Sequence, residues 1–309
     1  MKSLKLNRIV SNTLIYLILI VMSIIWVLPI VWLVLQSFGA ITTADGTILY
    51  GSIGVKAKLI PDVFTVNNYL YLFSNLTGVT NPLASGHSLD GLFLTWFGNT
   101  LVVAILSCLI STVFVLGTAY ALSRFRFKAR TAFMKVNLII GMFPGFLGMI
   151  IMYWVMRDII GLQGNYFSLV IIYSAGAGGG YYIAKGFFDT ISKNIDEAAM
   201  IDGATKSQIF WQIILPLAKP IVVYTVLTSF MGPWGDYVTS SYIIGLQNIK
   251  QWTVAIGLYQ MASGSQDIVT DYYTQFAAGA VCVAVPITLL FFMLQKYYVS
   301  GVTGGAVKG

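Results

Sequence analysis

Six apolar stretches of roughly membrane-spanning length constrain this 309-residue chain more than any other feature. They contain almost no Asp, Glu, Lys or Arg, and about 20 apolar residues suffice to cross the hydrocarbon core of a bilayer. Only 9% of the residues are charged, whereas an ordinary soluble domain carries about a quarter. We therefore expect an all-α polytopic membrane protein. The six expected transmembrane helices are 14–36, 95–122, 133–156, 166–187, 214–234 and 273–295.

The distribution of charge predicts the orientation of these spans. With a cytoplasmic N-terminus, 14 of the 18 Lys and Arg residues fall in the cytoplasmic segments or near the cytoplasmic ends of the spans, whereas 7 of the 11 acidic residues fall outside. This is the bias expected of membrane proteins. It predicts a cytoplasmic N-terminus at 1–13, a transmembrane domain at 14–295 and a cytoplasmic C-terminal tail at 296–309. The net charge of +7 therefore reflects topology, and nothing indicates nucleic-acid binding.

Several segments do not fit a simple span. The first apolar run is too long for a signal-peptide core, so we expect an uncleaved span. The segment 38–94 is too polar to cross and too long for a turn, which favours a small extracellular cap. The stretch 237–246 is apolar but short, so a re-entrant or interfacial position is expected. His87, the only histidine, lies in the segment 38–94, and the chain lacks the partner ligands that a metal site there would need.

The most polar part of the C-terminal half is 197–220, EAAMIDGATKSQIFWQIILPLAKP. Glu197 is the only glutamate, and Asn194 stands three residues before it, the spacing of an N-cap pair. Gly203 can adopt the positive φ that ends a helix. A second short helix is expected to follow, because Ile209, Phe210, Ile213 and Ile214 stand at helical spacing. Leu215-Pro216 and Pro220 then lead into the next span. The sequence thus predicts a helix–turn–helix knob within a cytoplasmic loop at 188–213.

Within the spans, two interpretations remain open for each unusual residue. Pro144 and Gly145 break a helix, which suits either a translocation path or plain helix packing. Trp234 and Tyr237 stand at a span end, as interface anchors do, but aromatic rings also stack on sugars. The basic run from Arg124 to Arg130 predicts a cytoplasmic anchor, which could also contact a partner or anionic lipid. Cys108 and Cys282 are expected to be small core residues, and no disulfide framework is indicated.

The chemistry that the chain lacks is informative. No Gly-Lys dipeptide occurs, so the phosphate-binding loop of many ATPases is absent. One His, one Glu and two separated Cys give no catalytic set and no metal site. A secondary transporter usually needs a carboxylate inside the spans, and Asp236 at a boundary is the nearest candidate. A transport subunit that borrows its energy from a partner is therefore preferred over a secondary transporter or a membrane enzyme.

The knob carries a recognisable motif. Its pattern, E-A-A-x3-G-x9-I-x-L-P, resembles the EAA loop of permease subunits of binding-protein-dependent ABC importers. The stretch AYALSRFRFKAR from Ala119 and the run Phe143-Pro144-Gly145 look like the carbohydrate branch of that family. The C-terminal end, from Pro286-Ile287-Thr288 through SGVTGGAVKG, resembles the MalG-type subunit of bacterial maltose and maltodextrin importers.

The resemblance implies a set of partners. The chain would pair with a second, MalF-like permease, a dimeric ABC ATPase that binds ATP and Mg, and an extracellular sugar-binding protein. An outer loop near 245–271 would touch the binding protein. Maltose and malto-oligosaccharides would be the substrates, with galacto-oligosaccharides as an alternative, and most sugar contacts would belong to the partner permease.

The resemblance also implies roles for particular residues. The ATPase-coupling residues would be Glu197, Ala198, Ala199, Asp202, Gly203, Ile213, Leu215 and Pro216. Tail residues that contact the ATPase would be Ser300, Gly301, Gly304, Gly305 and Lys308. Candidate pathway or substrate residues are Trp234, Tyr237, Pro144 and Gly145, and no catalytic or metal-binding residue is expected.

Overall fold

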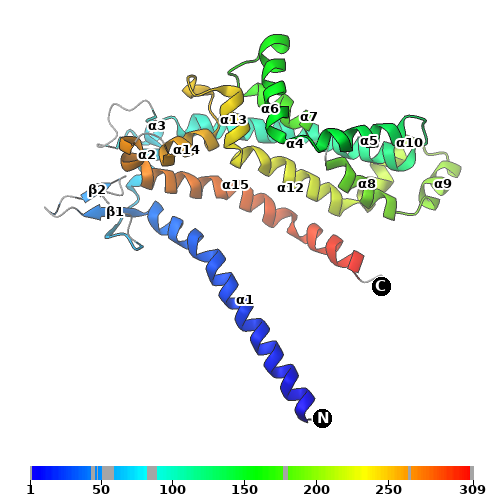
Figure 1. The fold of residues 1–309 in the computed structure, drawn as a ribbon, viewed down its shortest axis with the longest axis horizontal. Helices are drawn as coiled ribbons and strands as arrows, with labels where there is room; N and C mark the ends of the chain where they lie inside the picture. The colour runs from blue at the N-terminus through cyan, green and yellow to red at the C-terminus, as the bar shows by residue number, and fades with distance from the viewer. Residues whose placement is uncertain are drawn as a thin grey trace. The chain divides into compact units, whose positions relative to one another are not determined.

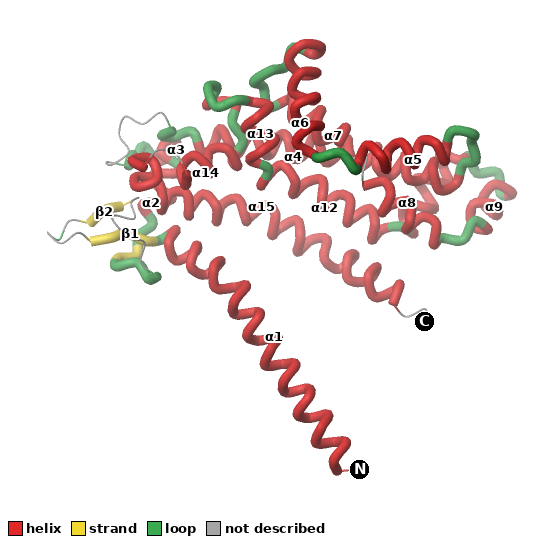
Figure 2. Tube along the Cα trace, in the orientation of Figure 1, coloured by secondary structure: helices red, strands yellow, loops and turns green. Residues whose placement is uncertain are grey.

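The computed structural model describes residues 2–42, 46, 48–50, 59–81, 89–176, 180–263 and 266–306. Helices dominate this part of the chain (Figure 1, Figure 2). The chain divides into two compact units, one formed by Met1–Gly91 with Gln260–Cys282 and the other by Leu92–Tyr259 with Val283–Gly309. His87 and Lys308 lie outside the described residues, so the predictions about them stay predictions.

The first unit contains a small antiparallel sheet of three strands, in the order β2-β1-β3. The central strand pairs on both sides, because Ala40 lies opposite Tyr50 of β2 and Val63 of β3. The sheet falls in the segment for which the sequence predicts a cap. Its strands and the helices that follow are β1 (Gly39–Thr42), β2 (Ile48–Tyr50), β3 (Val63–Phe64), α2 (Asn67–Leu72) and α3 (Ser74–Thr77).

Asn68 connects the separate parts of this unit. Its side chain is fully buried, and its Nδ2 donates to the carbonyl oxygens of Ser37 and Gly39, both at 2.9 Å. Its Oδ1 accepts a hydrogen bond from Thr274 Oγ1 at 2.9 Å. A buried amide is costly unless its donors and acceptor are matched, and here they are. The beginning of the sheet, α2 and the beginning of α15 (Gln266–Ala306) are thereby joined.

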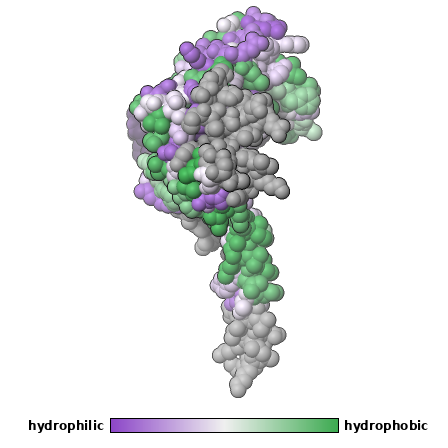
Figure 3. Space-filling view, turned by 90° about the vertical axis from the view of Figure 1, so that its left-hand side faces the viewer, coloured by the Kyte–Doolittle hydropathy of each residue, from purple (hydrophilic) through white to green (hydrophobic). Residues whose placement is uncertain are grey.

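Helix α1 (Lys2–Ser37) is apolar around its circumference from Leu14 to Leu35, and it runs through Pro29 without ending. Its described side chains from Ser11 to Val31 are all exposed, with Trp26 at 71% and Ile30 at 62%. In Figure 3 most of the coloured part of this helix is hydrophobic. A helix that is hydrophobic on every face requires an apolar surrounding, so α1 fits the first predicted span.

The other predicted spans are met in part. Among the described residues, three helices are long and apolar enough to cross a membrane, namely Ser11–Ser37, Phe93–Arg124 and Tyr272–Tyr297. Two further candidates are bent pairs, Arg130–Gly141 with Gly145–Ile160 (99°) and Lys206–Leu217 with Lys219–Gly235 (86°). The first bend falls at Pro144, where the sequence predicts a break. The stretch 166–187 is described as α7 (Phe167–Gly176) and α8 (Tyr181–Thr190), and residues 177–179 between them lie outside the described ones.

The second unit is built along α4 (Phe93–Arg124). Helices α7, α8 and α12 (Lys219–Gly235) all pack on it (Figure 1). Serine and alanine on α4 are buried at these contacts, and small residues let helices approach closely. The other elements of this unit include α5 (Arg130–Gly141), α6 (Gly145–Trp154), the π-helix η1 (Val155–Ile160), α13 (Tyr237–Ile244), the 3₁₀-helix η4 (Ile249–Gln251) and α14 (Val254–Ser263).

The N-terminal end of α4 is closed by the segment around η4 and α14. Trp96 is fully buried, its ring lies 5.6 Å from that of Trp252, and its Nε1 donates to Ile249 O at 2.8 Å. Thr100 Oγ1 accepts from the Val254 amide at 2.8 Å. Gly257 lies directly against the Trp96 ring, since a Cβ there would stand 2.0 Å from Cε3. Neutral hydrogen bonds and close ring packing therefore fix this end.

Candidate functional site

The motif-bearing segment folds into short helices joined by a tight turn. Helix α9 (Asn194–Ile201) is not capped by any side chain. The prediction that Asn194 is its N-cap is wrong, because the backbone already turns at Lys193 and a capping residue needs an extended conformation. Asp196 and Glu197 lie in the first turn of α9, where negative charge interacts favourably with the helix dipole.

The turn after α9 follows the prediction for Gly203. Gly203 has a φ of 84°, in the left-handed region, and its amide donates to Met200 O at 3.1 Å. The Ala204 amide reaches back to Ala199 O at 2.9 Å. Together these two bonds form a Schellman motif, which closes a helix with glycine at the first residue beyond it. The chain reverses here within three residues.

The second helical stretch begins with a capping box that the sequence-based predictions did not include. The Gln208 amide donates to Thr205 Oγ1 at 3.3 Å, and the Thr205 amide donates to Gln208 Oε1 at 2.8 Å. The spacing of a Thr followed three residues later by a Gln was the available signal. The stretch continues through α10 (Lys206–Gln208), the π-helix η3 (Ile209–Ile214) and α11 (Leu215–Leu217).

The prolines mark where this stretch turns into α12. Pro216 stands at the start of α11 and Pro220 at the start of α12, the positions where a missing amide proton costs least. The chain bends by 86° between Leu217 and Lys219. The predicted role of Leu215-Pro216 and Pro220, which is to set the entry into the next apolar helix, is consistent with this geometry.

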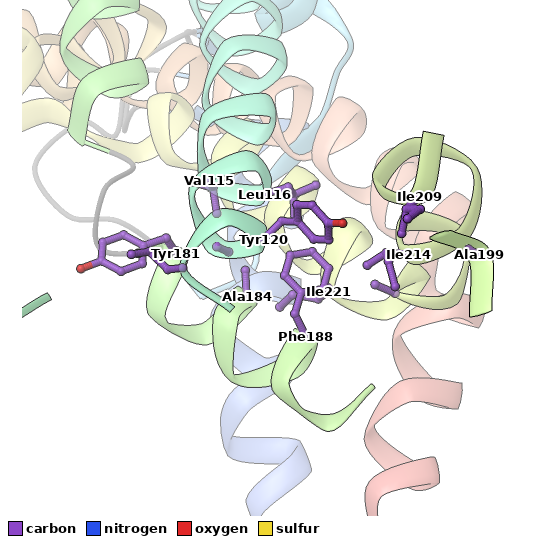
Figure 4. Close-up of a cluster of buried hydrophobic side chains, with 13 residues drawn as sticks. Val115, Leu116, Tyr120, Tyr181, Ala184, Phe188, Ala199, Ile209, Ile214 and Ile221 are labelled. Carbon is purple, nitrogen blue, oxygen red and sulfur yellow. The ribbon is translucent and has the colours of Figure 1, made fainter. Parts of the chain in front are cut away.

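A buried cluster forms the base of the segment (Figure 4). Ala199, Ile209 and Ile214 contribute to it, and Ile213 and Leu215 pack against it. On the opposite side stand Tyr120 of α4 and Phe188 of α8, whose rings meet edge to face at 6.2 Å. The second alanine of the motif is therefore a packing residue, whereas the first, Ala198, is exposed.

An ion pair ties α9 to the end of α4. Arg124 Nε lies 3.0 Å from Asp196 Oδ2, and the two side chains are only 5% and 11% exposed. The N–H is not aligned on the oxygen, so the contact is an ion pair rather than a hydrogen bond. Arg124 Nη2 also donates to Ile191 O at 3.0 Å. Asp196 was not among the expected residues, since nothing in the sequence pairs it with an arginine 72 positions away.

Asp189 on α8 makes a second charged contact close to that end of α4. Ser123 Oγ donates to Asp189 Oδ1 at 2.6 Å, and Lys185 Nζ lies 2.5 Å from Oδ2. Partial burial alone would raise the pKa of the Asp189 carboxyl. The hydrogen bonds from Lys185 and Ser123 outweigh it, so this pKa lies below its ordinary value.

Above the buried base, α9 presents an exposed face of mixed character. Glu197 and Asp202 are exposed, and so are two large apolar side chains, Met200 at 46% and Ile201 at 85%. Apolar side chains that stand out on a rigid, polar turn are typical of a contact surface for another protein. We call Glu197, Ala198, Met200, Ile201 and Asp202 the knob face.

The candidate pathway residues lie in different environments. Trp234 is 3% exposed and packs edge to face on Phe97 at 5.1 Å, so it is neither a surface anchor nor open to a ligand. Tyr237 is half-buried and stacks on Tyr259 at 3.7 Å. Pro144 and Gly145 are exposed. Asp236 caps α13 through the Thr239 amide and accepts from Tyr173 Oη, both at 2.9 Å, which gives it a structural use.

The described part of the C-terminal tail belongs to the helix before it. Ser300, Gly301, Gly304 and Gly305 continue the backbone of α15, which ends at Ala306. Extending an existing helix carries no nucleation cost, which explains how a glycine-rich segment can be helical. Among the described residues, no group of three His, Cys, Asp or Glu could hold a metal ion. Cys108 is buried, Cys282 is half-buried, and both are free thiols.

These features describe a multi-pass membrane protein with an exposed helix–turn–helix knob, and comparison with known proteins gives the family. Residues 113–304 match the family described as "Binding-protein-dependent transport system inner membrane component". The chain belongs to this family of transport permeases, which are not enzymes. It is a membrane subunit of the carbohydrate branch of ABC permeases, as the motif indicates.

Individual relatives cover the whole chain. The galactooligosaccharides transport system permease protein GanQ of Bacillus subtilis is 34% identical over 99% of both chains. The maltodextrin transport system permease protein MalD of Streptococcus pneumoniae is 33% identical, also over 99% of both. The maltodextrin permease MdxG of Bacillus subtilis is 39% identical over 71% of this chain and 77% of its own.

A solved structure has the same fold. A chain of a bacterial ABC transporter involved in the import of the acidic polysaccharide alginate superposes with a TM-score of 0.71. The alignment covers 94% of this chain and 96% of that chain at 22% identity.

Proposed function

We propose that this chain is one of two permease subunits of an ATP-driven ABC importer that moves malto-oligosaccharides across the cell membrane by alternating access. Family membership and the relatives named as maltodextrin permeases support this proposal. GanQ, named for galactooligosaccharides, is similar to the same degree. Galacto-oligosaccharides are therefore the second candidate substrate.

The proposed topology has six crossings with both termini in the cytoplasm. Three straight helices and two bent pairs would supply five crossings, and α7 with α8 would supply the sixth. The excess of Lys and Arg in the segments assigned to the cytoplasm supports this orientation. It puts the loop at 188–213 on the cytoplasmic side, where an ATPase can reach it, and the segment 38–94 outside.

The single observation that carries the mechanism is the knob face above its buried base. A partner ATPase, which would bind the ATP and Mg, grips Glu197, Ala198, Asp202 and the turn at Gly203. Because Ala199 is anchored against the cluster around Tyr120, a push on the knob moves α4 as well. Ile213, Leu215 and Pro216 carry the movement around the bend into α12. The permease pair then opens alternately to the two sides.

Further contacts complete the proposed importer. The end of α15, with Ser300, Gly301, Gly304, Gly305 and beyond it Lys308, reaches the ATPase dimer. The outer segment 245–271 faces the sugar-binding protein. Trp234 and Tyr237 are proposed to shape the passage from inside its walls, since Trp234 is buried and Tyr237 is stacked. Pro144 and Gly145, which are exposed, are proposed to lie along the passage.

The test replaces Gly203 by proline in the chain coexpressed with its ATPase, second permease and binding protein. Proline cannot adopt a φ of 84° and removes the amide that bonds to Met200 O, so we expect sugar uptake to be lost while the protein still inserts. Gly161 is the matched control, because it has a φ of 75° and nothing lies within 4 Å of the position a Cβ would take. Gly161→Pro should keep more uptake. Normal uptake by the Gly203→Pro complex would contradict the coupling role.

A second experiment identifies the substrate. The purified complex is reconstituted into vesicles and given its binding protein, ATP and an equal mixture of maltotriose and a galactotriose. The sugar that accumulates inside the vesicles is identified by mass spectrometry. We expect maltotriose to dominate. Import of the galactotriose alone would identify galacto-oligosaccharides as the substrate instead of malto-oligosaccharides. Import of neither sugar would refute both substrate proposals.

A further inference from the structure

Two cavities of similar size lie along α4, and they differ in how many hydroxyl-bearing residues line them. The first, of about 510 Å³, is lined mainly by aliphatic and aromatic side chains such as Phe114, Phe133 and Val170. The second, of about 460 Å³, is lined by eight hydroxyl-bearing residues. Val115 contributes to both. Either volume suits a small organic ligand.

The hydroxyl groups of the second cavity come from four helices. We call this space, with its walls from α4, α7, α12 and α13, the hydroxyl cavity. Among the described residues that line it, none is charged, so it does not attract an ion by charge. Its hydroxyl residues are Ser107, Ser111, Tyr173, Tyr224, Thr225, Thr228, Ser229 and Thr239.

The wall formed by α12 offers hydrogen-bond acceptors. Thr225 Oγ1 donates to Ile221 O at 2.8 Å, and Thr228 Oγ1 donates to Tyr224 O at 2.9 Å. A backbone carbonyl can only accept, so each hydroxyl proton is used within its own helix. The lone pairs of the two oxygens remain for a ligand that donates.

On the wall formed by α4, the serine hydroxyls make only long hydrogen bonds. Ser107 Oγ stands 3.5 Å from Ala104 O, and Ser111 Oγ stands 3.4 Å from Cys108 O. Such contacts are long for an O–H···O bond, whose usual distance is about 2.7–2.8 Å. Both side chains are buried, so a better partner for their protons would be favourable. This wall therefore offers donors as well as acceptors.

A ligand that fits both walls must be neutral, of moderate size, and able to donate and accept at several points. Sugar hydroxyls do both, whereas a lipid chain would prefer the apolar cavity. We propose that the hydroxyl cavity is a sugar-binding station on this subunit, with Thr228 and Ser229 among its contacts. This proposal rests on the proposed function as a sugar importer. It adds a sugar site on this chain, although the family resemblance implies that most sugar contacts belong to the partner permease.

The test uses the assembled complex with saturating binding protein. Thr228→Val and Ser229→Ala remove only the hydroxyls, and each should lower uptake at limiting sugar by about 2- to 10-fold, as expected for one lost hydrogen bond. ATP hydrolysis without sugar should be unchanged. Ser174→Ala is the matched control, because Ser174 lines the apolar cavity and its hydroxyl also donates to its own helix, to Val170 O at 2.6 Å.

A labelling experiment separates a binding role from a structural one. In a Cys108→Ala, Cys282→Ala background, Ser229→Cys is treated with a small neutral thiol reagent, with and without maltotriose and ATP. We expect the transported sugar to slow labelling several-fold. If wild-type complexes import sugar, but the sugar does not slow labelling and Thr228→Val and Ser229→Ala leave uptake unchanged, the station is refuted and the importer stands. If wild-type complexes import no sugar, both proposals fail together.

Discussion

The two ends of α4 are both buried, but different kinds of contact hold them. At the N-terminal end, Trp96 and Thr100 meet η4 and α14 through rings and neutral hydrogen bonds. At the C-terminal end, Arg124 is buried beside Asp196. Arg124 Nη1 and Asp196 Oδ1 have no hydrogen-bond partner among the residues that the structure describes. At the N-terminal end the buried Thr253 Oγ1 also lacks a partner among the described residues, but it is a neutral group. The two ends therefore differ in that the C-terminal end leaves atoms of charged groups without hydrogen bonds.

Under the proposed mechanism, this difference favours the C-terminal end of α4 as the end that moves with a partner. Close ring packing resists displacement, because interiors packed to high density tolerate little rearrangement. An ion pair with unmatched atoms can gain partners when another protein docks nearby. The knob face lies on the helix that Asp196 anchors, so the end held by the ion pair is also the end that carries the proposed coupling residues.

The largest effect is expected from breaking the charged end. Asp196→Ala leaves Arg124 buried without its carboxylate, which typically costs about 3–5 kcal/mol. We expect a lower thermal midpoint of the purified chain and faster trypsin cleavage at Lys193 and Lys206. Asp202→Ala, at an exposed carboxylate of the knob face, is the control and should change neither. A stable Asp196→Ala protein with slow cleavage would remove the distinction between the two ends.

The next effect tests the packed end. Gly257→Ala places a methyl group 2.0 Å from Trp96 Cε3, so α14 must move away from α4. Overpacking of this kind costs about 1–3 kcal/mol. The thermal midpoint should fall, and the fluorescence of the buried tryptophans should shift toward that of solvated indole. Gly232→Ala, where a Cβ meets nothing within 4 Å, should have neither effect.

A smaller loss is expected at the capping box. Thr205→Ala removes the acceptor for the Gln208 amide, and losing an N-cap typically costs about 1 kcal/mol. Because α10 is short, we expect fraying there to show as faster amide exchange over 205–209, with the N-terminal end of α4 unaffected. Thr205→Ser, which keeps the oxygen, should restore protection. Equal amide exchange in the wild type, Thr205→Ala and Thr205→Ser would mean that the capping box does not stabilise this helix.

The smallest effect is a dependence on pH. The contacts to Lys185 and Ser123 hold the pKa of Asp189 below its unfolded value, so its charge stabilises the fold above that unfolded pKa. This contribution should disappear as the pH falls below about 4, through the lower folded-state pKa. Thermal midpoints measured from pH 6 to pH 3 should fall less in Asp189→Asn than in wild type. The reverse order would contradict the assigned contact.

Local signals predicted most of what lies along the chain. The apolar runs located α1, α4 and α15, Pro144 located a break, and Gly203 located the turn of the knob. Each of these depends on residues near in sequence, such as a missing amide proton or the freedom of glycine. The sequence did not distinguish Asn194 from Thr205 as a cap, because both residue types occupy that position and the backbone decides between them.

Contacts between segments far apart in the sequence could not be predicted from such local signals. The pairs Arg124–Asp196 and Thr100–Val254 depend on how helices meet, which no spacing rule specifies. The same holds for the hydroxyl cavity, whose serines and threonines are scattered over several helices. Of the candidate site, the motif could therefore be predicted from sequence, while its buried base and its link to α4 required the structure.

Asn68 has a consequence for how the protein is made. It bonds to carbonyls of residues 37 and 39 near one end of the chain and to Thr274 near the other, a separation of 206 residues. During translation α1 can enter the bilayer at once, since its whole surface suits lipid. The Asn68 amide, by contrast, waits for most of the polypeptide to leave the ribosome before its last partner exists. The hydrogen bonds around Asn68 can therefore be completed only late in synthesis, although Asn68 itself is made early. In a chain that stops before Thr274, the Asn68 Oδ1 would lack this partner.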